Sequence, residues 1–487
     1  MSAQAKHRIA HVVDILGNVI GRDQPILRMD KALEMASTFN DEIFKSDDVV
    51  FFDPFCKAAE LLLSCAYLTC KSKSLSNNKL LEVSEIYTEI FESGKYFALS
   101  PDERHHRLSL RTFLGNSKSH EERFNHIIRN GNYLSEIDGT LNNEIFKQEF
   151  TSMIEYIKKQ SGDKKIIAIG NPPYQESDGG FGGSSTTIYN FFVEALMDCS
   201  EIDEFVMVIP SRWFTAGKGV DHFRNRIINS KQIKKIVHFP KSKTVFPTVD
   251  VLGGVCFFNY CSSYNGDVHF ISDDTDKKVN FSKHDIILDD PLGYDIVEEI
   301  QARWNGKYVS DVAWSGKPFG IRTFYFSRNE VVHETDKNAI PCYTKRRKVK
   351  FANIEHLDKN TDRINEWKVA VPAAYAPGSK TGVRRVTLPI NQYFIIPRGH
   401  ITTETYNIVH SFKTKKEAEN FISFLVTPLA RYLLGLRKVT QHIPKDRWNW
   451  VPLVDAKKEW STDSVFKEFN INTQTQKHIM KKIKEWS

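Results

Sequence analysis

Apolar runs of strand length alternate with longer segments of helical periodicity through the first half of the chain. This alternation constrains the fold more than any other feature of the sequence. The strand-like runs are residues 49–52, 165–169, 205–209, 233–239 and 251–258, and the helix-like segments are residues 24–46, 58–68, 188–199 and 219–229. Continuous apolar strands separated by helices are typical of a mostly parallel sheet covered by helices on both faces. The sequence therefore predicts an α/β fold.

Two unusual turns follow predicted strands. Asp53 and Pro54 end the first strand-like run, and Asn171-Pro172-Pro173-Tyr174 follows the run at 165–169. Ligands of open parallel sheets bind at the carboxyl ends of the strands. We therefore expect both turns to lie at a ligand site.

The second turn has the groups needed to activate an amino group on a base. Such an amino group is a poor nucleophile, because its lone pair is delocalised into the ring. The side-chain oxygen of Asn171 and the carbonyl oxygen of Pro172 are two acceptors for its N–H hydrogens. Pro172 and Pro173 make the backbone rigid, and Tyr174 offers a flat face for a base to stack on. The alternative is a rigid turn that only ends the strand.

A series of motifs resembles, in order, the N6-adenine DNA methyltransferases of restriction–modification systems. The catalytic motif of that family is GNPPY, at residues 170–174 here. The other matching segments are VVFFDPFCKAAELLL (49–63), YFALSPDE (96–103), FVMVIPSRWF (205–214), HFPKSKTVFPTVDVLGGVCFF (238–258) and VTQHIPKDRWNWVPLVD (439–455). The order, with the cofactor motifs first, is that of the gamma class. The resemblance implies a Rossmann-like fold and S-adenosyl-L-methionine as cofactor.

The resemblance also implies roles for single residues. Asp53, Pro54, Cys56 and Ala59 would hold the cofactor, at a turn where the family usually has a glycine near position 59, and Glu103 would bind the ribose.

For the reaction itself, the resemblance implies that Asn171, Pro172, Pro173 and Tyr174 are catalytic. The target adenine would leave the DNA duplex and stack between Tyr174 and Phe246. Its N6 atom would then take the methyl group of the cofactor. The glycine-rich stretch 178–185 is either a loop that closes over the site or a plain linker.

Charge divides the chain. Residues 301–487 contain 33 Lys and Arg against 17 Asp and Glu, a balance of +16, whereas residues 1–300 have a balance of −9. A basic part favours a polyanion partner such as double-stranded DNA. We therefore expect a catalytic domain at 1–280 and an α+β target-recognition domain at 281–487. Lys345, Arg346, Arg347 and Lys348 would contact phosphates there, unless they only face solvent.

Other classes of protein fit the sequence less well. The seven cysteines include no CxxC pair, so we expect no metal site. The amino terminus has no secretory signal, and no apolar run is long enough for a membrane helix, so we expect a cytoplasmic protein.

The sequence thus predicts a site-specific adenine DNA methyltransferase. It would be the modification component of a restriction–modification system, with a separately encoded restriction endonuclease as a further partner, or an orphan methylase. Two alternatives stay open: an RNA or protein-amine methyltransferase with the same motif, and a catalytically inactive or auxiliary DNA-binding subunit.

Overall fold

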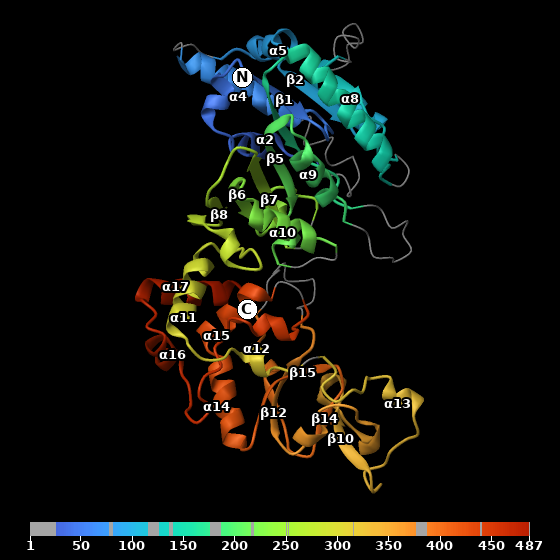
Figure 1. Ribbon diagram of the computed structural model, residues 1–487, viewed down its shortest axis with the longest axis vertical. Coiled ribbons are helices and arrows are strands. Elements are labelled where there is room, and N and C mark those ends of the chain that lie inside the picture. Colours follow the sequence, from blue (N-terminus) through green and yellow to red (C-terminus); the bar gives the residue numbers. More distant parts are fainter. Residues whose placement is uncertain are drawn as a thin grey trace. The chain divides into compact units, whose positions relative to one another are not determined.

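The computed structural model divides the chain into two compact units, Met1–Pro291 and Leu292–Ser487 (Figure 1). It describes residues 26–76, 81–114, 126–135, 140–175, 187–215, 219–249, 251, 253–314, 316–375, 387–438 and 441–486. The glycine-rich stretch 178–185 lies outside these residues.

The first unit contains a large sheet and most of the described helices. Its strands are β1 (Val49–Asp53), β2 (Tyr96–Ser100), β3 (Ile128–Asn130), β4 (Lys165–Gly170), β5 (Ile202–Pro210), β6 (Ile233–Phe239), β7 (Val255–Cys261), β8 (Val268–Ser272) and β9 (Thr275–Val279). Its helices are α2 (Met29–Ala36), α3 (Asp41–Lys45), α4 (Glu60–Ser76), α5 (Val83–Glu92), α6 (Glu103–Leu114), α8 (Asn143–Ser161), α9 (Tyr189–Asp198) and α10 (Asp221–Ser230).

The strands of the first unit form one sheet in the order β3-β2-β1-β4-β5-β7-β6-β8-β9. Strands β3, β2, β1, β4 and β5 are parallel to one another. Strand β7 runs antiparallel between β5 and β6, β8 is parallel to β6, and β9 is antiparallel to β8. The mostly parallel sheet that the sequence predicts is therefore confirmed.

Consecutive residues of β1 explain why helices cover both faces of this sheet. Side chains alternate between the two faces of a strand. The ring of Phe51 stacks on Phe44 of α3, at 5.7 Å between centroids, whereas Phe52 contacts Phe150 of α8, at 6.1 Å. Because both faces of β1 are buried, the strand is apolar throughout and shows no alternation.

Two of the predicted elements are wrong in their extent. The helix expected at 24–46 is interrupted between α2 and α3, because the side chain of Asn40 accepts a hydrogen bond from the backbone N–H of Glu42 and starts a new helix. The strand expected from residue 251 begins at Val255. Gly254 has a φ of 84°, and a Cβ at this position would lie 2.3 Å from the carbonyl oxygen of Phe239.

The first unit also extends further along the chain than the expected boundary at 280/281. The ring of Phe281 packs edge to face on Phe270 of β8. The backbone N–H of Ile287 donates to the carbonyl oxygen of Phe214, and Ile286 and Ile287 are buried. These contacts attach the segment to the first unit, so the division falls after Pro291.

The second unit is α+β. Its helices are α11 (Leu292–Arg303), α12 (Val309–Val312), α13 (Tyr325–Arg328), α14 (Lys415–Leu425), α15 (Pro428–Arg437), α16 (Thr462–Glu468) and α17 (Thr473–Glu485). Its strands are β10 (Ala339–Tyr343), β11 (Val349–Asn353), β12 (Trp367–Pro372), β13 (Phe394–Ile396), β14 (Ile401–Thr402) and β15 (Tyr406–Phe412). They form two small sheets, β11-β10-β14 and β13-β12-β15, and α14 packs against the second.

Candidate active site

The two unusual turns lie next to each other at one edge of the large sheet. Strands β1 and β4 are parallel neighbours, with Val49 opposite Lys165 and Phe52 opposite Ala168. The strand order changes direction between them, because β2 and β3 continue on one side and β5 on the other. Such a switch point opens a crevice outside the carboxyl ends of the strands, where ligands bind. The turns after β1 and β4 border this crevice.

The turn after β4 is packed tightly from its first residue. A Cβ at Gly170 would lie 2.8 Å from the ring of Phe55 and 3.0 Å from the sulfur of Met207, so this position requires glycine. Asn171 is only 2% exposed, and Pro172 and Pro173 are buried as well. The surrounding residues therefore hold the backbone that carries the two predicted acceptors, the side-chain oxygen of Asn171 and the carbonyl oxygen of Pro172.

Tyr174 and Phe246, which we expect to stack on a base, touch each other. Their ring centroids are 6.2 Å apart and their planes meet at 76°, an edge-to-face contact. Phe246 is 1% exposed and belongs to the hydrophobic core, and Tyr174 packs against the same core. Burial raises the pKa of the Tyr174 hydroxyl, so this group stays protonated. A base can enter between the rings only after they move apart, and its stacking there stays a prediction.

The turn after β1 is held by the neighbouring strand and helix. One carboxylate oxygen of Asp53 accepts the backbone N–H of Phe55 at 3.0 Å, and burial, with the nearby Glu60, raises the pKa of Asp53. The carbonyl oxygen of Pro54 accepts the hydroxyl of Tyr133 at 2.9 Å.

Cys56 completes this attachment. Its backbone N–H donates to the carbonyl oxygen of Leu99 in β2 at 3.0 Å, and its Sγ atom lies 3.4 Å from the hydroxyl of Ser109 in α6. Burial raises the pKa of the thiol, so Cys56 is a packed neutral group and no thiolate nucleophile.

Ala59 adopts the conformation for which glycine is suited. Its φ is +58°, in the left-handed region, and its side chain is fully buried. An L-residue with a Cβ pays roughly 1–2 kcal/mol there. The expected glycine thus has a backbone reason, and this chain tolerates the strain of alanine at the position.

Glu103, the predicted ribose ligand, is already engaged by its own surroundings. It starts α6, and one carboxylate oxygen accepts the Nε–H of Arg107 at 2.6 Å while the other accepts the amide of Asn130 at 2.7 Å. The preceding Asp102 is buried and accepts both the backbone N–H and the ring Nδ1 of His105, at 2.9 and 2.7 Å. Burial acts to raise the pKa of Asp102, but the contacts with His105 outweigh it and lower the value. The ribose role of Glu103 stays a prediction.

Two charged residues escaped the sequence prediction, Lys57 in the turn after β1 and Glu60 at the start of α4. Lys57 and Glu60 are both 2% exposed. Burial lowers the pKa of Lys57 to about 8 and raises that of Glu60. The available signal was the placement of a lysine and a glutamate inside an otherwise apolar segment, FCKAAELLL.

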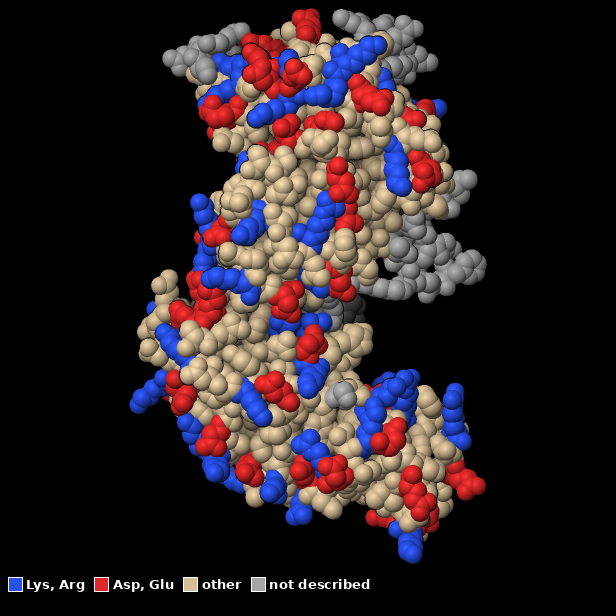
Figure 2. All heavy atoms as spheres, viewed as in Figure 1, with Lys and Arg blue, Asp and Glu red and all other residues tan. Residues whose placement is uncertain are grey.

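The basic run of the second unit forms the turn between the antiparallel strands β10 and β11. Lys345, Arg346, Arg347 and Lys348 are all exposed there, and Figure 2 shows the Lys and Arg side chains on one face of the molecule. Arg347 differs from the other three. Its guanidinium lies over the ring of Phe394, 4.4 Å from the centroid, and donates to a backbone carbonyl.

Within the residues that the structure describes, no group of three or more His, Cys, Asp and Glu side chains could hold a metal ion. No described helix is both long and apolar enough to cross a membrane.

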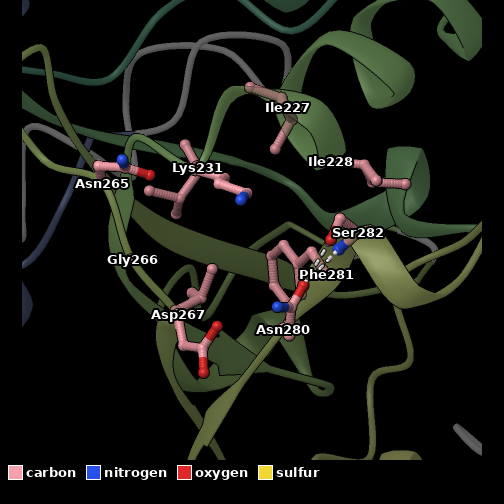
Figure 3. Close-up of a pocket in the computed structure, with 11 residues that line it drawn as sticks. Ile227, Ile228, Lys231, Asn265, Gly266, Asp267, Asn280, Phe281 and Ser282 are labelled. Carbon is pink, nitrogen blue, oxygen red and sulfur yellow. Dashed lines mark hydrogen bonds between the residues drawn. The ribbon is translucent and has the colours of Figure 1, made fainter.

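A small pocket lies at the opposite edge of the large sheet. It has a volume of about 150 Å³ and is bordered by the end of α10 and the amino ends of β6 and β8 (Figure 3). Ile227 and Ile228 contribute apolar surface, and Lys231 and Asp267 contribute opposite charges. Because β6 and β8 run in the direction of β4, this pocket is remote from Asn171 and does not belong to the candidate active site.

Comparison with known proteins finds relatives of the region that includes the turn after β4. Residues 60–246 match the family described as Eco57I restriction-modification methylase. A protein of Mycoplasma pneumoniae (strain ATCC 29342 / M129 / Subtype 1), described as an uncharacterized adenine-specific methylase, is 34% identical over 115 residues. These residues are 23% of this chain and 27% of the relative, so the similarity spans about a quarter of each protein.

Two solved structures share part of the backbone arrangement at low sequence identity. The DrdV–DNA complex has a TM-score of 0.45 and 10% identity, covering 91% of this chain and 59% of that chain. The type IIG restriction endonuclease BpuSI has a TM-score of 0.43 and 10% identity, covering 99% and 63%. The chain thus spans less than two thirds of either protein. The sequence match to the family described as Eco57I restriction-modification methylase thus covers residues 60–246, which is less than half of this chain.

Proposed function

We propose that this protein transfers a methyl group from S-adenosyl-L-methionine to the N6 atom of adenine at specific sites in DNA. The observation that carries the proposal is the position of Asn171-Pro172-Pro173-Tyr174 at the carboxyl end of β4, beside the turn after β1 at the switch point of the sheet. The match of residues 60–246 to a methylase family supports the same reaction.

In this proposal the chain activates adenine by hydrogen bonding and orientation. The side-chain oxygen of Asn171 and the carbonyl oxygen of Pro172 accept the two N6 hydrogens, which concentrates the lone pair on nitrogen. Pro172 and Pro173 restrict the backbone, so the acceptors keep their positions. The adenine leaves the duplex to reach them, and Tyr174 and Phe246 separate to receive it.

The turn after β1 fits the cofactor. Asp53 lies at the end of β1, and the hydroxyl of Ser100 at the end of β2 is buried without a hydrogen-bond partner among the described residues. A polar ligand at these strand ends would satisfy it. When bound, the cofactor supplies a methyl group on a positively charged sulfur, which needs no metal for activation. Asp53, Pro54, Cys56, Ala59 and Glu103 are the proposed binding residues.

The second unit is the proposed DNA-recognition domain, in which Lys345, Arg346 and Lys348 contact phosphates. Arg347 instead maintains the shape of the turn, since its side chain is bound within the unit. The partner of the whole protein would be double-stranded DNA. The protein would act in the cytoplasm, either as a modification component with a separate restriction endonuclease or as an orphan methylase.

A specific observation also favours a second candidate, a DNA-binding subunit without methyl transfer. Ala59 carries a Cβ in a left-handed turn where the backbone is expected to approach the cofactor. If this methyl group blocks the approach, the chain would keep its DNA contacts and lose the cofactor.

Radiolabelled cofactor and duplex DNA distinguish the two candidates. We expect label in DNA and, after digestion to nucleosides, N6-methyladenine by mass spectrometry. Sequencing that detects methylated adenine would then identify the recognition site in cells that express the protein. Label in cytosine, RNA or protein would overturn the substrate assignment. DNA binding without cofactor binding in calorimetry would favour the second candidate.

A further inference from the structure

An aromatic ring of the second unit faces solvent. Of the Phe, Tyr and Trp side chains that the structure describes, Phe324 is the one that is exposed, at 46%. It directly precedes the short helix α13 (Figure 1). A single exposed apolar side chain is common on protein surfaces and needs no function. The surroundings of this ring therefore decide whether it has one.

Exposed cations surround the ring. The guanidinium of Arg328 lies 4.4 Å from its centroid and that of Arg322 lies 5.9 Å from it. Two residues further on, the ammonium of Lys350 lies 5.2 Å from the centroid of Phe326. None of these three cations forms an ion pair with a carboxylate in the described part of the chain, so their charge is available to a partner.

Both neighbours of Phe324 in the sequence are fixed by distant residues. The backbone N–H and the hydroxyl of Thr323 donate to the carboxylate of Glu404, at 2.8 and 3.2 Å. Tyr325 is buried, and its hydroxyl oxygen accepts the backbone N–H of Asn353 in β11 at 3.0 Å. The ring is thus presented on a preorganised backbone, which lowers the entropy cost of binding through it.

The chemistry of this surface favours DNA over a protein partner. Its cations match phosphates, and a flat apolar ring matches the faces of bases. The surface is also continuous with the basic turn, because β11, which contains Lys350 and Asn353, begins directly after Lys348.

We propose that Phe324 inserts between two neighbouring base pairs of duplex DNA and kinks the duplex, while Arg322 and Arg328 pair with phosphates beside that step. Apolar side chains that enter a base step in this way unstack it and bend the DNA. This inference rests on the proposed function. It adds a contribution to site choice that needs no hydrogen bond to a base edge, because pyrimidine–purine steps unstack most easily.

The bend of the DNA tests the proposal. Energy transfer between dyes at the two ends of a duplex of about 30 base pairs that carries the recognition site reports the bend. Wild-type protein should raise the transfer. Phe324→Ala should abolish this rise and weaken binding about 5- to 150-fold, which is the range for one lost stacking contact. Phe324→Leu should keep part of the bend, because leucine also acts as a wedge.

The salt dependence of binding separates the ring from its cations. Phe324→Ala removes no phosphate contact, so the slope of the logarithm of the binding constant against that of the salt concentration should not change. Replacing Arg322 and Arg328 with Gln together should make that slope shallower by about 1.8, or about 0.9 for each contact.

Met480→Ala is the matched control. Met480 is an apolar side chain of α17 in the same unit, and its exposure of 48% is close to that of Phe324. This variant should bind and bend DNA as the wild type does. Because both side chains are exposed, the free energy of unfolding should change little in either variant, and urea unfolding checks this.

A second measurement locates the inserted ring. 2-Aminopurine, which emits more strongly when its stacking is lost, is placed at successive positions of the duplex. Its emission should rise at one step besides the methylated adenine, and this additional rise should be absent with Phe324→Ala.

The outcomes separate this inference from the proposed function. If the wild type binds DNA and Phe324→Ala binds and bends it equally well, the inference fails, the proposed function stands, and the ring is left to a protein partner. If Phe324→Ala weakens binding of single-stranded DNA alone, the ring stacks on unpaired bases and the wedge is overturned. If the wild type binds no DNA, the proposed function fails as well.

Discussion

The charged residues that follow β1 in the first unit are buried, whereas those of the basic turn in the second unit are exposed. Lys57, Glu60 and Asp53 are about 2% exposed or less, at the carboxyl ends of parallel strands. Lys345, Arg346 and Lys348 face solvent on the turn between two antiparallel strands. A buried charge acts through close contacts and salt screens it little, whereas an exposed charge acts at long range and salt screens it strongly. Substitutions of the buried charges should therefore have effects that depend little on salt, whereas substitutions of the exposed charges should have effects that salt weakens.

The largest expected effect is that of Asn171→Ala in the first unit. It removes one acceptor for the N6 hydrogens, and methyl transfer should fall about 10²- to 10³-fold, as it does when an oxyanion-hole donor is deleted. Binding of cofactor and DNA should persist. Single-turnover transfer of labelled methyl groups is the measurement.

Asn280→Ala is the control for this substitution. Asn280 lies at the opposite edge of the sheet, where its side chain accepts the backbone N–H of Ser282 at 3.0 Å. Its transfer rate should equal that of the wild type. If Asn171→Ala transferred methyl groups at the wild-type rate, Asn171 would not be a catalytic residue.

The second prediction concerns stability, and it follows from the burial of Lys57. Burial lowers the pKa of Lys57 from 10.5 to about 8, so at neutral pH folding buries an ammonium that has no ion pair with the described residues. Lys57→Met should therefore raise the free energy of unfolding of the ligand-free protein at pH 7 by up to about 3 kcal/mol.

The pH dependence fixes the sign of this effect. Between pH 8 and 10.5 the unfolded chain holds the proton that the folded chain has lost. Wild-type stability should therefore rise with pH through this window, and Lys57→Met should lack the rise. Lys95→Met should instead destabilise, because the ammonium of the buried Lys95 donates to Ser46 and Asp47. Urea unfolding over this pH range measures both, and a wild-type stability that does not rise would contradict the burial of Lys57 without an ion pair among the described residues.

The third prediction concerns the second unit. Neutralising Lys345, Arg346 and Lys348 together should weaken DNA binding about equally for all sequences. The slope of the logarithm of the binding constant against the logarithm of the salt concentration should become shallower by about 2.7, or about 0.9 for each phosphate contact. At 0.15 M salt this corresponds to a loss of about a hundredfold. The recognition sequence should stay the same, because phosphate contacts position the protein and base contacts specify the site.

Two controls sharpen this test. Neutralising Lys413, Lys415 and Lys416, also exposed in the second unit, removes the same charge elsewhere and should change the slope less. Arg347→Gln should disturb the turn, since it loses the contact with Phe394, without removing a phosphate contact. An unchanged slope in the first triple variant would mean that this turn only faces solvent.

The smallest expected effect is that of Ala59→Gly. Glycine relieves the left-handed strain of roughly 1–2 kcal/mol but loses more chain entropy on folding, so the net gain in stability should be about 0.5–1 kcal/mol. Cofactor affinity should rise if the Cβ hinders approach. Ala58→Gly is the control: Ala58 has no positive φ, so the substitution should destabilise by a similar amount. Equal effects of the two substitutions would argue against strain at Ala59.

Local patterns in the sequence were enough to predict the strand-like elements and the two turns. The run VVFFD is apolar throughout because both of its faces are buried, and GNPPY follows a strand because its prolines cannot continue a sheet. The interrupted helix at 37–40 was missed. Its signal is one side-chain hydrogen bond from Asn40, which competes with the helical pattern of the neighbouring apolar residues.

Only the tertiary structure decided which side chains of these motifs are already bound by other residues and which are open to a ligand. Glu103 matches a ribose-binding position in sequence, yet Asn130, which lies far along the chain, occupies one of its oxygens. Arg347 belongs to a uniform basic run, yet Phe394 from another strand holds it. Lys57 and Glu60 are two charged residues just after β1, and only the packing of β1, β2 and α6 around them buries them. Residues that are distant in sequence determine which side chains are buried and which are paired, and local periodicity cannot predict those residues.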